Sequence, residues 1–378
     1  MNCGPNAILV ISPEPWDAHN VSKHHYARTL AERGARVFFL NPPDDSQSEF
    51  KIENKKSISN LHIVSAPNIA RGLRFYPSIL RRWLEKRWLA RFEKAIDTKI
   101  DIIWLFENSR FFDMRFAGYR LKIYHQVDLN QNFQPEVAAS TADICFCTTD
   151  FIKDELLPYN SKTYKIHHGT ALVKNKGQLM ADQQARFNLD CPHAVYIGNL
   201  DMLYLDAELL ADVVRRFPEV HFHFVGGYNE KGKLWNLASS LSNVTWWGKV
   251  DHSMIPAILD HVDILLVTYQ AERYKDQASP HKFMEYLASG KVIVSTYTDE
   301  YKDKHQLLEM VERNDDFPDT FGKIVANLEK YNSPERQDAR IEFARQHTYD
   351  KQLDKIFDLL KKHDLYQKIE KGNRQYDI

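Results

Sequence analysis

The chain has 378 residues, with 50 Lys and Arg against 51 Asp and Glu, and its formal net charge is −1. This balance excludes the strongly basic proteins that coat nucleic acids, and we expect no nucleic-acid partner. Hydrophobic residues make up 43% of the chain and charged residues 27%, which excludes a disordered or collagen-like protein and suits two globular domains.

The first 150 residues alternate between short apolar runs and longer amphipathic stretches. One of these stretches, residues 22–33, has helical spacing and ends before Gly34. Buried strands joined by helices are typical of a parallel sheet that is covered on both faces. We therefore predict a first Rossmann-like domain of the α/β class over residues 1–175. Its predicted strands are residues 7–12, 37–40, 61–64, 102–106, 123–125 and 144–148.

Residues 71–94 (RGLRFYPSILRRWLEKRWLARFEK) contain eight basic and two acidic side chains. The apolar side chains follow helical spacing, which predicts an amphipathic helix with a basic opposite face. Two interpretations stay open. In one, the basic face lies on anionic lipid, where each basic residue contributes about 1 kcal/mol. In the other, the apolar stripe packs on the first domain and the charges are solvated. The stripe consists of Leu80, Trp83, Leu84, Trp88, Phe92 and Ile96.

The alternation of strands and helices restarts after a polar, linker-like stretch at residues 174–190. We predict a second doubly wound, Rossmann-like domain over residues 190–340, followed by helices in residues 341–378 that pack back on the first domain. We expect the two domains to face each other across a cleft, with ligands at the carboxyl ends of the strands. The predicted strands of the second domain are residues 194–197, 221–225, 244–246, 264–267 and 292–295, and its helices lie near 206–216, 232–240, 254–259 and 280–289.

The most informative segment reads SPHKFMEYLASGKVIVS and begins at Ser279. Ser279 is a good N-cap, Pro280 suits the first helical position, and Gly290 lets the helix end before a buried strand. A helix N-terminus favours anions, and Lys282 adds a full positive charge, so this end can bind a diphosphate. Glu285 lies one turn later on the same face, where its carboxylate can accept hydrogen bonds from ribose hydroxyls. An ordinary surface Lys–Glu pair is the alternative.

This segment resembles the donor-site motif of GT-B glycosyltransferases of family 4 and related types, in which a small residue, Pro, x, Lys and two further residues precede Glu-Tyr-Leu-Ala-x-Gly-Lys. Three other stretches resemble parts of the C-terminal domain of that family: YIGNLD at residues 196–201, FHFVGG at 222–227 and NVTWWGKVDHSMIPAILDHVDILLVTY at 243–269. The resemblance covers residues 190–300 well and the first half weakly. It implies a GT-B fold and a nucleotide-sugar donor.

The resemblance also implies roles for the residues that match the motif. The residue at the position of Lys282 contacts the diphosphate, and the one at the position of Glu285 contacts the ribose. The other predicted donor-binding residues are Gly198 and Asn199 near the phosphates, Gly248 and Val250 near the base, and Ser279, Pro280, His281 and Tyr286 around the helix.

The sequence departs from the pattern of the family at two places. Many members have a second Glu eight positions before the ribose Glu, where this chain has Gln277. The Gly-Gly loop that commonly follows the first strand is replaced by PEPWDAHN at residues 13–20. The contacts to the donor sugar and the shape of the first subsite are therefore expected to differ.

Glycosyl transfer breaks an anomeric C–O bond with a diphosphate as the leaving group, so negative charge must be stabilised and an acceptor hydroxyl deprotonated. Lys282 can do the first, assisted by Arg273. Asp128 follows a predicted strand and is the expected base if the reaction inverts configuration, or a positioning residue if it retains configuration. The alternative is that Asp128 caps a turn. The residues predicted on the acceptor side are Asp17, His19 and His125.

The predicted function is transfer of a sugar from a nucleotide-sugar, with a UDP-sugar favoured, to a saccharide or lipid-linked saccharide, as in bacterial polysaccharide or glycolipid assembly. A GT-B-fold nucleotide-sugar epimerase and a non-catalytic nucleotide-sugar-binding homologue are the alternatives. No Asp-x-Asp motif, Cys-x-x-Cys pair or zinc-ligand spacing occurs, so we expect no metal and no cofactor. Without a basic leader or a long apolar window, we expect a cytoplasmic protein with a peripheral contact on the plasma membrane through residues 71–94.

Overall fold

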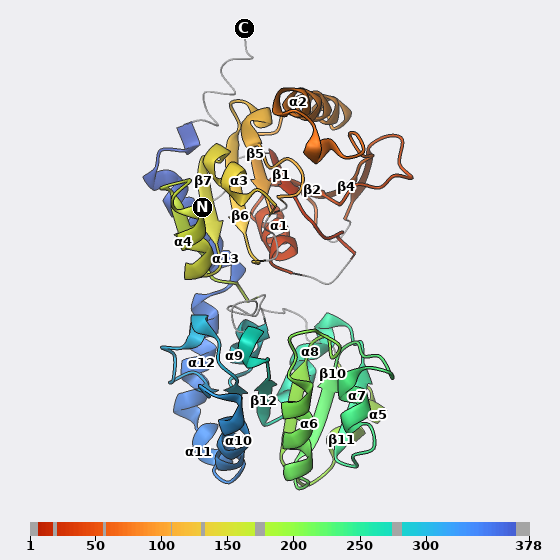
Figure 1. Ribbon diagram of the computed structural model, residues 1–378, viewed down its shortest axis with the longest axis vertical. Coiled ribbons are helices and arrows are strands. Elements are labelled where there is room, and N and C mark those ends of the chain that lie inside the picture. Colours follow the sequence, from red (N-terminus) through yellow and green to blue (C-terminus); the bar gives the residue numbers. More distant parts are fainter. Residues whose placement is uncertain are drawn as a thin grey trace. The chain divides into compact units, whose positions relative to one another are not determined.

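The computed structural model describes residues 7–17, 21–55, 58–106, 108–129, 133–170, 178–273 and 282–367. The contacts within the chain divide it into two compact units (Figure 1). Unit 1 consists of Met1–His168 together with Tyr349–Ile378, and unit 2 consists of Gly169–Thr348. Each unit is built around a sheet that is wholly or largely parallel, and the predicted α/β class with two doubly wound domains is confirmed.

The sheet of unit 1 has the strand order β3-β4-β2-β1-β5-β6-β7-β8, and only β3 runs antiparallel to its neighbour. The central strand β1 pairs in parallel register with β2, from Ala7 opposite Arg36 to Ile11 opposite Leu40. Successive side chains of β1 point to opposite faces, yet each is at most 2% exposed, so both faces of the sheet are covered. The strands are β1 Ala7–Ile11, β2 Arg36–Leu40, β3 Lys51–Asn54, β4 Leu61–Ser65, β5 Ile102–Leu105, β6 Leu121–Gln126, β7 Ile144–Cys147 and β8 Thr163–Lys165.

The last helix of the chain belongs to unit 1 and packs on its first helix. The rings of His25 and Tyr349 stack with centroids 4.7 Å apart, and Arg33 Nε donates a hydrogen bond to Asp350 Oδ1 at 2.8 Å. The sequence predicted that residues 341–378 as a whole return to the first domain, but residues 341–348 stay with unit 2. The helices of unit 1 are α1 Ser22–Glu32, α2 Ser78–Ala95, α3 Pro135–Thr141, α4 Asp150–Leu156 and α13 Tyr349–Lys362.

Helix α2 is oriented differently from the prediction. Trp88, Phe92 and Ile96 pack into the core as the apolar spacing indicates, but Leu80 and Trp83 are 44% and 54% exposed. The apolar stripe is therefore buried only in the second half of the helix.

The inward face of the first half of α2 carries charge. Arg81 is 7% exposed and Glu85 1% exposed, and the Arg81 guanidinium lies 3.6 Å from the carboxylate of Asp113, which is fully buried. A buried carboxylate needs a cation nearby. Arg115 binds this carboxylate more closely, at 2.7 and 2.9 Å, and the inward Arg81 adds a second positive charge beside it.

The sheet of unit 2 has the order β11-β10-β9-β12-β13-β14 and is parallel throughout. Five of its strands coincide with predicted strands, and the two-residue β14 was not predicted because so short a pairing leaves no periodic signal. The strands are β9 His193–Ile197, β10 His221–Val225, β11 Val244–Gly248, β12 Ile264–Val267, β13 Val292–Ser295 and β14 Glu309–Met310.

Helices cover both faces of the sheet of unit 2. Helices α6, α7 and α10 contribute side chains such as Leu210 and Phe321 to one hydrophobic core, and α8, α9 and α12 contribute side chains such as Ile258 and Leu287 to the other. The helices are α5 Ala181–Gln184, α6 Ala207–Arg216, α7 Lys233–Ala238, α8 Ile255–Asp260, α9 Lys282–Ser289, α10 Phe317–Val325, α11 Leu328–Tyr331 and α12 Pro334–Gln346.

Candidate functional site

Three glycines lie where β9, β10 and β11 end, at the same edge of the parallel sheet. Gly198, Gly226 and Gly248 all have positive φ, at +148°, +141° and +69°. A Cβ atom on Gly226 would lie 1.8 Å from the carbonyl oxygen of Gly198, so only glycine fits at position 226. The Gly226 N–H donates to the Gly248 carbonyl at 2.9 Å. The three loops therefore pack directly against one another at the carboxyl edge of the sheet, where ligands of such folds bind.

Lys282 begins helix α9 and reaches toward this edge. Its side chain is half-buried, but its Nζ atom is buried and has no hydrogen-bond partner among the described residues. The Nζ atom lies 3.9 Å from the centre of the Tyr196 ring and 5.3 Å from that of Tyr269. A Cβ atom on Gly198 would come within 3.1 Å of Nζ, so the glycine keeps the space that the ammonium occupies.

The environment of Lys282 lowers its pKa. Burial disfavours the charged form and lowers the pKa from 10.5 to about 7, although the nearby Glu285 carboxylate acts in the opposite direction. The two aromatic faces attract the cation but offer it no hydrogen-bond acceptor. Among the described residues, no acceptor occupies the hydrogen-bond donors of the Lys282 amino group.

Glu285 is paired with a residue that the sequence did not single out. Its Oε1 atom lies 2.7 Å from Nε2 of His252, and the side chains are 18% and 36% exposed. His252 opens a short helical turn, His252–Met254, which follows β11 and is capped by Asp251. The only sequence signal for His252 was its place in the GKVDHS stretch. For that stretch the sequence predicted donor contacts at Gly248 and Val250 and assigned no role to the His252 side chain.

Tyr286 was predicted to bind the donor, but it is fully buried. Its hydroxyl accepts a hydrogen bond of 2.9 Å from the N–H of Ile197, at the end of β9. Burial raises the pKa of this hydroxyl well above its usual value. Tyr286 therefore fixes helix α9 against the strand that precedes Gly198, and it is a positioning residue.

The other predicted donor residues are found in the loops. Asn199 is exposed, and its side-chain oxygen accepts a hydrogen bond from the N–H of Asp201 at 3.0 Å. Val250 is half-buried against the core that contains α8 and α9. The predicted residues Ser279, Pro280 and His281, the departure Gln277 and the side chain of Arg273 lie outside the described residues.

The stretch that contains these loops matches a known protein family. The model of the family described as glycosyl transferases group 1 aligns with residues 191–329. Residues 191–329 are called the group 1 domain below, after the family whose model they match. The resemblance predicted from the sequence is thereby confirmed for the part of unit 2 that holds Lys282 and Glu285.

A curated relative matches over part of its length. The Bacillus subtilis protein TuaH, a candidate teichuronic acid biosynthesis glycosyltransferase, is 25% identical over 164 residues. The alignment covers 41% of this chain and 40% of TuaH, so it spans less than half of the relative.

Solved structures share the fold over almost the whole chain. Sucrose-phosphate synthase from Thermosynechococcus elongatus superposes with a TM-score of 0.68 at 15% identity and covers 97% of this chain and 100% of that one. Anabaena HepE, solved in complex with UDP and glucose, superposes with a TM-score of 0.66 at 13% identity and covers 93% and 99%. These similarities extend the GT-B fold from the group 1 domain to the full chain.

The predicted acceptor-side residues lie in unit 1, outside the group 1 domain. Asp128 is exposed and follows β6, as predicted, and its backbone carbonyl accepts a hydrogen bond from Gln126 Nε2 at 3.4 Å. Asp17 is 84% exposed at the side chain and lies 3.3 Å from Lys55 Nζ. His19 lies outside the described residues.

The structure corrects the prediction for His125. This side chain is 1% exposed within β6, and its ring packs 4.9 Å from the ring of Phe106 and 5.4 Å from that of Tyr26. Burial, and then the charge of Lys23, lowers its pKa to about 3. His125 is thus a neutral part of an aromatic core, which the polar KIYHQ sequence did not reveal.

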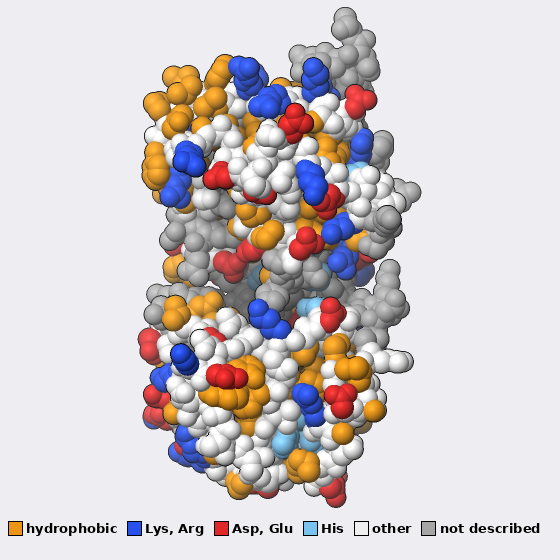
Figure 2. All heavy atoms as spheres, turned by 90° about the vertical axis from the view of Figure 1, so that its right-hand side faces the viewer, with side chains coloured by type: hydrophobic (Ala, Val, Ile, Leu, Met, Phe, Trp, Pro, Cys, Tyr) orange, Lys and Arg blue, Asp and Glu red, His pale blue; other side chains and the backbone are white. Residues whose placement is uncertain are grey.

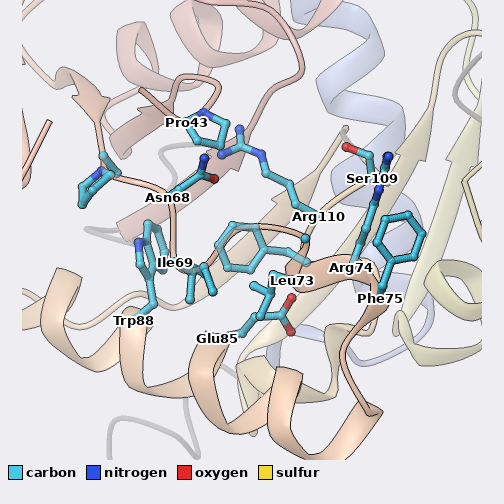
Figure 3. Close-up of a pocket in the computed structure, with 15 residues that line it drawn as sticks. Pro43, Asn68, Ile69, Leu73, Arg74, Phe75, Glu85, Trp88, Ser109 and Arg110 are labelled. Carbon is cyan, nitrogen blue, oxygen red and sulfur yellow. The ribbon is translucent and has the colours of Figure 1, made fainter. Parts of the chain in front are cut away.

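Two hollows were not predicted, and neither contains Lys282 or Glu285. One of about 380 Å³ in the group 1 domain lies between the loop after β9 and the start of α7, with Asp201, Asn229 and Lys233 among its lining residues. The other, of about 360 Å³, lies in unit 1, where Glu85 and Trp88 project from α2 toward Arg110 (Figure 3). Burial raises the pKa of Glu85 to about 8.

No group of three or more His, Cys, Asp or Glu side chains in the described part of the chain is placed to hold a metal ion. No described helix is long and apolar enough to span a bilayer.

Proposed function

We propose that this protein is a glycosyltransferase that moves a sugar from a UDP-sugar to a hydroxyl of a saccharide. The observation that carries the proposal is the Lys282 ammonium, which is buried over the Tyr196 ring and has no hydrogen-bond partner among the described residues. A buried cation without a partner is unfavourable unless an anion supplies the missing interactions. The diphosphate of a nucleotide-sugar is such an anion, and Gly198 leaves room for the Nζ atom that would bind it.

Glu285 is proposed to bind the ribose of the same nucleotide. Its carboxylate has about four acceptor sites, so ribose hydroxyls can bond to it while the 2.7 Å contact with His252 is kept or exchanged. His252 is proposed to orient this carboxylate. Gly248 and Val250, which precede His252, would then lie near the base. The complex of the structural relative HepE with UDP and glucose supports uracil as that base.

The chemistry follows from charge. When the anomeric C–O bond breaks, its electron pair passes to the diphosphate oxygen, and the Lys282 ammonium stabilises the charge that develops there. Arg273 is proposed to assist, and Ser279, Pro280 and His281 to complete the phosphate contacts. No metal is required by this scheme.

Asp128 remains the proposed base if the configuration inverts. Its exposed position after β6 leaves it accessible to an acceptor hydroxyl, and it would orient the acceptor if the configuration is retained. Asp17 and His19, after β1, are proposed on the acceptor side. The match to TuaH supports an acceptor that is a saccharide used in polysaccharide assembly. We propose that this saccharide is linked to a lipid.

Lys282→Met and Glu285→Gln test the site. We expect each change to lower the rate of UDP release from UDP-glucose, with a panel of saccharide acceptors, by at least about 100-fold. UDP should raise the melting temperature of the parent protein and not that of Lys282→Met. Without ligand, Lys282→Met should melt at the same or a higher temperature, because it removes a buried charge without a partner.

Lys323→Met, at an exposed position of α10, is the matched control and should leave both readouts unchanged. Normal turnover in both site variants would contradict the assignment. UDP binding without turnover would favour the non-catalytic alternative, and conversion of a UDP-sugar without an acceptor would favour the epimerase.

A further inference from the structure

Exposed hydrophobic side chains concentrate on one short segment of unit 1. Ten large hydrophobic residues are exposed in the described part of the chain, and four of them lie within residues 75–83. Phe75 is 73% exposed, Ile79 76%, Leu80 44% and Trp83 54%. Single exposed apolar residues are common, but a cluster of large ones marks a surface that contacts an apolar partner.

The same segment is positively charged on its outer side. Its basic residues Arg74, Lys86 and Arg87 are exposed, whereas Glu85 is buried. The Arg74 guanidinium lies 4.8 Å from the centre of the Phe75 ring, and that of Arg87 lies 5.5 Å from the Trp83 ring. Exposed apolar and basic side chains thus lie next to one another, as seen at the top of Figure 2.

The spacing of the residues along α2 places the exposed apolar and basic side chains on one side of the helix. Ile79, Trp83, Lys86, Arg87 and Lys94 are exposed and lie on one side of the helix, because residues three or four apart share a face. The apolar members come first and the basic ones follow. Arg81 and Glu85 are buried on the opposite side of the helix, where the Arg81 guanidinium lies 3.6 Å from the Asp113 carboxylate.

We propose that this surface, formed by Phe75, Ile79, Leu80, Trp83, Arg74, Lys86 and Arg87 and here called the basic apolar face, docks on an anionic lipid bilayer. Aromatic and aliphatic side chains enter the boundary between headgroups and acyl chains, while the basic side chains contact lipid phosphates. A bilayer fits better than an apolar protein surface because the exposed charges of the face are all of one sign. Arg74 and Phe75 also line the 360 Å³ hollow of unit 1, so a docked bilayer would border it.

This inference goes beyond the proposed transfer reaction and does not depend on it. Vesicle binding is measured on the full chain without donor or acceptor, so its failure is distinguishable from failure of the UDP site.

Co-sedimentation with vesicles tests the proposal. We expect the protein to bind vesicles of phosphatidylcholine with about one-third phosphatidylglycerol and to bind pure phosphatidylcholine at least about tenfold more weakly. Ile79→Ser combined with Trp83→Ser, and Lys86→Glu combined with Arg87→Glu, should each weaken binding to anionic vesicles about tenfold or more. All four residues are exposed, so melting temperatures should stay unchanged.

The matched controls make the same kinds of substitution at exposed positions outside the basic apolar face. Leu157→Ser with Leu189→Ser alters side chains that are 42% and 53% exposed, and Lys323→Glu with Lys330→Glu alters two exposed charges of unit 2. Both controls should bind vesicles like the parent protein. Equal binding by all variants, or no binding to anionic vesicles, would overturn the proposal.

Fluorescence gives an independent readout, because Trp83 is exposed whereas the other six tryptophans are buried or half-buried. Lipids brominated in the acyl chain should quench the parent protein, and this quenching should be lost in Trp83→Phe, which keeps an aromatic ring and still binds. A concentration-dependent dimer that Trp83→Ser dissociates, without vesicle binding, would instead assign the face to a second copy of the chain.

Discussion

Lys282 is a charged side chain that has no hydrogen-bond partner in the described part of the chain. Its Nζ lies over Tyr196, beside Gly198 and among groups that offer no acceptor within the described residues. Burial lowers its pKa to about 7, so the proton is held weakly until an anion arrives. The bound diphosphate would favour the charged form and raise that pKa again.

We therefore expect UDP affinity to fall as pH rises from 7 to 9. Above pH 7 the free protein progressively loses the Lys282 proton and must regain it on binding, so the Kd should rise by up to about tenfold per pH unit. Calorimetry in buffers of different ionisation enthalpy measures this proton uptake. Lys282→Met should bind weakly at every pH and take up no proton; a parent Kd that is equal at pH 7 and pH 9 would refute the assignment.

The same shift affects stability, with a defined sign. Unfolding returns Lys282 to its ordinary pKa of 10.5, so between pH 7 and 10.5 the unfolded chain binds more protons than the folded one. The contribution of this group to the free energy of unfolding therefore rises with pH across that window.

Gly226 is a second residue on which the site depends. We expect Gly226→Ala to destabilise the protein by about 3 kcal/mol or more, because the new Cβ would overlap the Gly198 carbonyl at 1.8 Å. Gly34→Ala is the control: it has the same kind of positive φ, +94°, but no atom within 4 Å of the new Cβ, and it should cost about 1 kcal/mol. Denaturant unfolding measures both, and equal losses would contradict the close approach of the two loops.

At the scale of elements, helix α9 is held at its middle and just after its carboxyl end. Tyr286 ties it to the end of β9, and buried Arg340 of α12 donates to the carbonyls of Gly290, Leu307 and Tyr331 at 2.9 to 3.0 Å. Arg340 is fully buried, and burial lowers its pKa to about 10. These contacts fix the helix whose first residue is Lys282.

We expect Arg340→Met to lower the stability of unit 2 by roughly 3 to 5 kcal/mol, since three buried carbonyls would lose their donor. Differential scanning calorimetry should show the loss as a downward shift of the transition that UDP raises. Arg345→Met, at an exposed position of the same helix, should change little. An unshifted transition in Arg340→Met would show that α12 does not support the site.

Helix α2 forms where the apolar spacing predicts a helix, but the side of it that faces the core differs from the predicted side in its first half. Its apolar spacing is regular, but in the first half of the helix Arg81 and Glu85 face inward, and the Arg81 guanidinium lies 3.6 Å from the buried Asp113 carboxylate. The basic apolar face results from this orientation. The sequence predicted an apolar stripe on one side of the helix and the charges on the other, so it did not predict this surface.

At the scale of the whole molecule, each unit has its own sheet and its own cores. The residues proposed for UDP binding, apart from those outside the described part, all belong to unit 2. The chain leaves unit 1 after His168 and returns to it at Tyr349, so donor binding and the basic apolar face belong to different units.

We expect UDP to slow amide hydrogen exchange in residues 196–200, 226–227 and 282–290 of unit 2 and to leave strands β1 and β5 of unit 1 unchanged. Binding protects amides in the segments that it orders. Mass spectrometry of peptic fragments resolves these segments. Protection centred on unit 1 would show that the nucleotide binds there.

Much of this organisation could be derived from local patterns. Apolar runs predicted most strands of both sheets, since a strand buried on both faces has a strong signal, whereas exposed β3 and the short β14 have none. The motif around Lys282 and Glu285 was recognisable because the donor-site motif that it resembles has particular residue types at fixed spacing.

The partners of those residues depend on the tertiary structure. His252 contacts Glu285, Arg81 contacts Asp113, and Gly226 packs against Gly198. The members of each pair lie far apart in the sequence, so no local periodicity indicates that they are neighbours. His125 illustrates the same limit, because a histidine beside an aspartate at a strand end suits a catalytic site or an aromatic core equally well. Residue types and spacing specify elements and motifs through local energetics, but burial, and with it pKa, orientation and pairing, depends on which distant side chains the fold brings together.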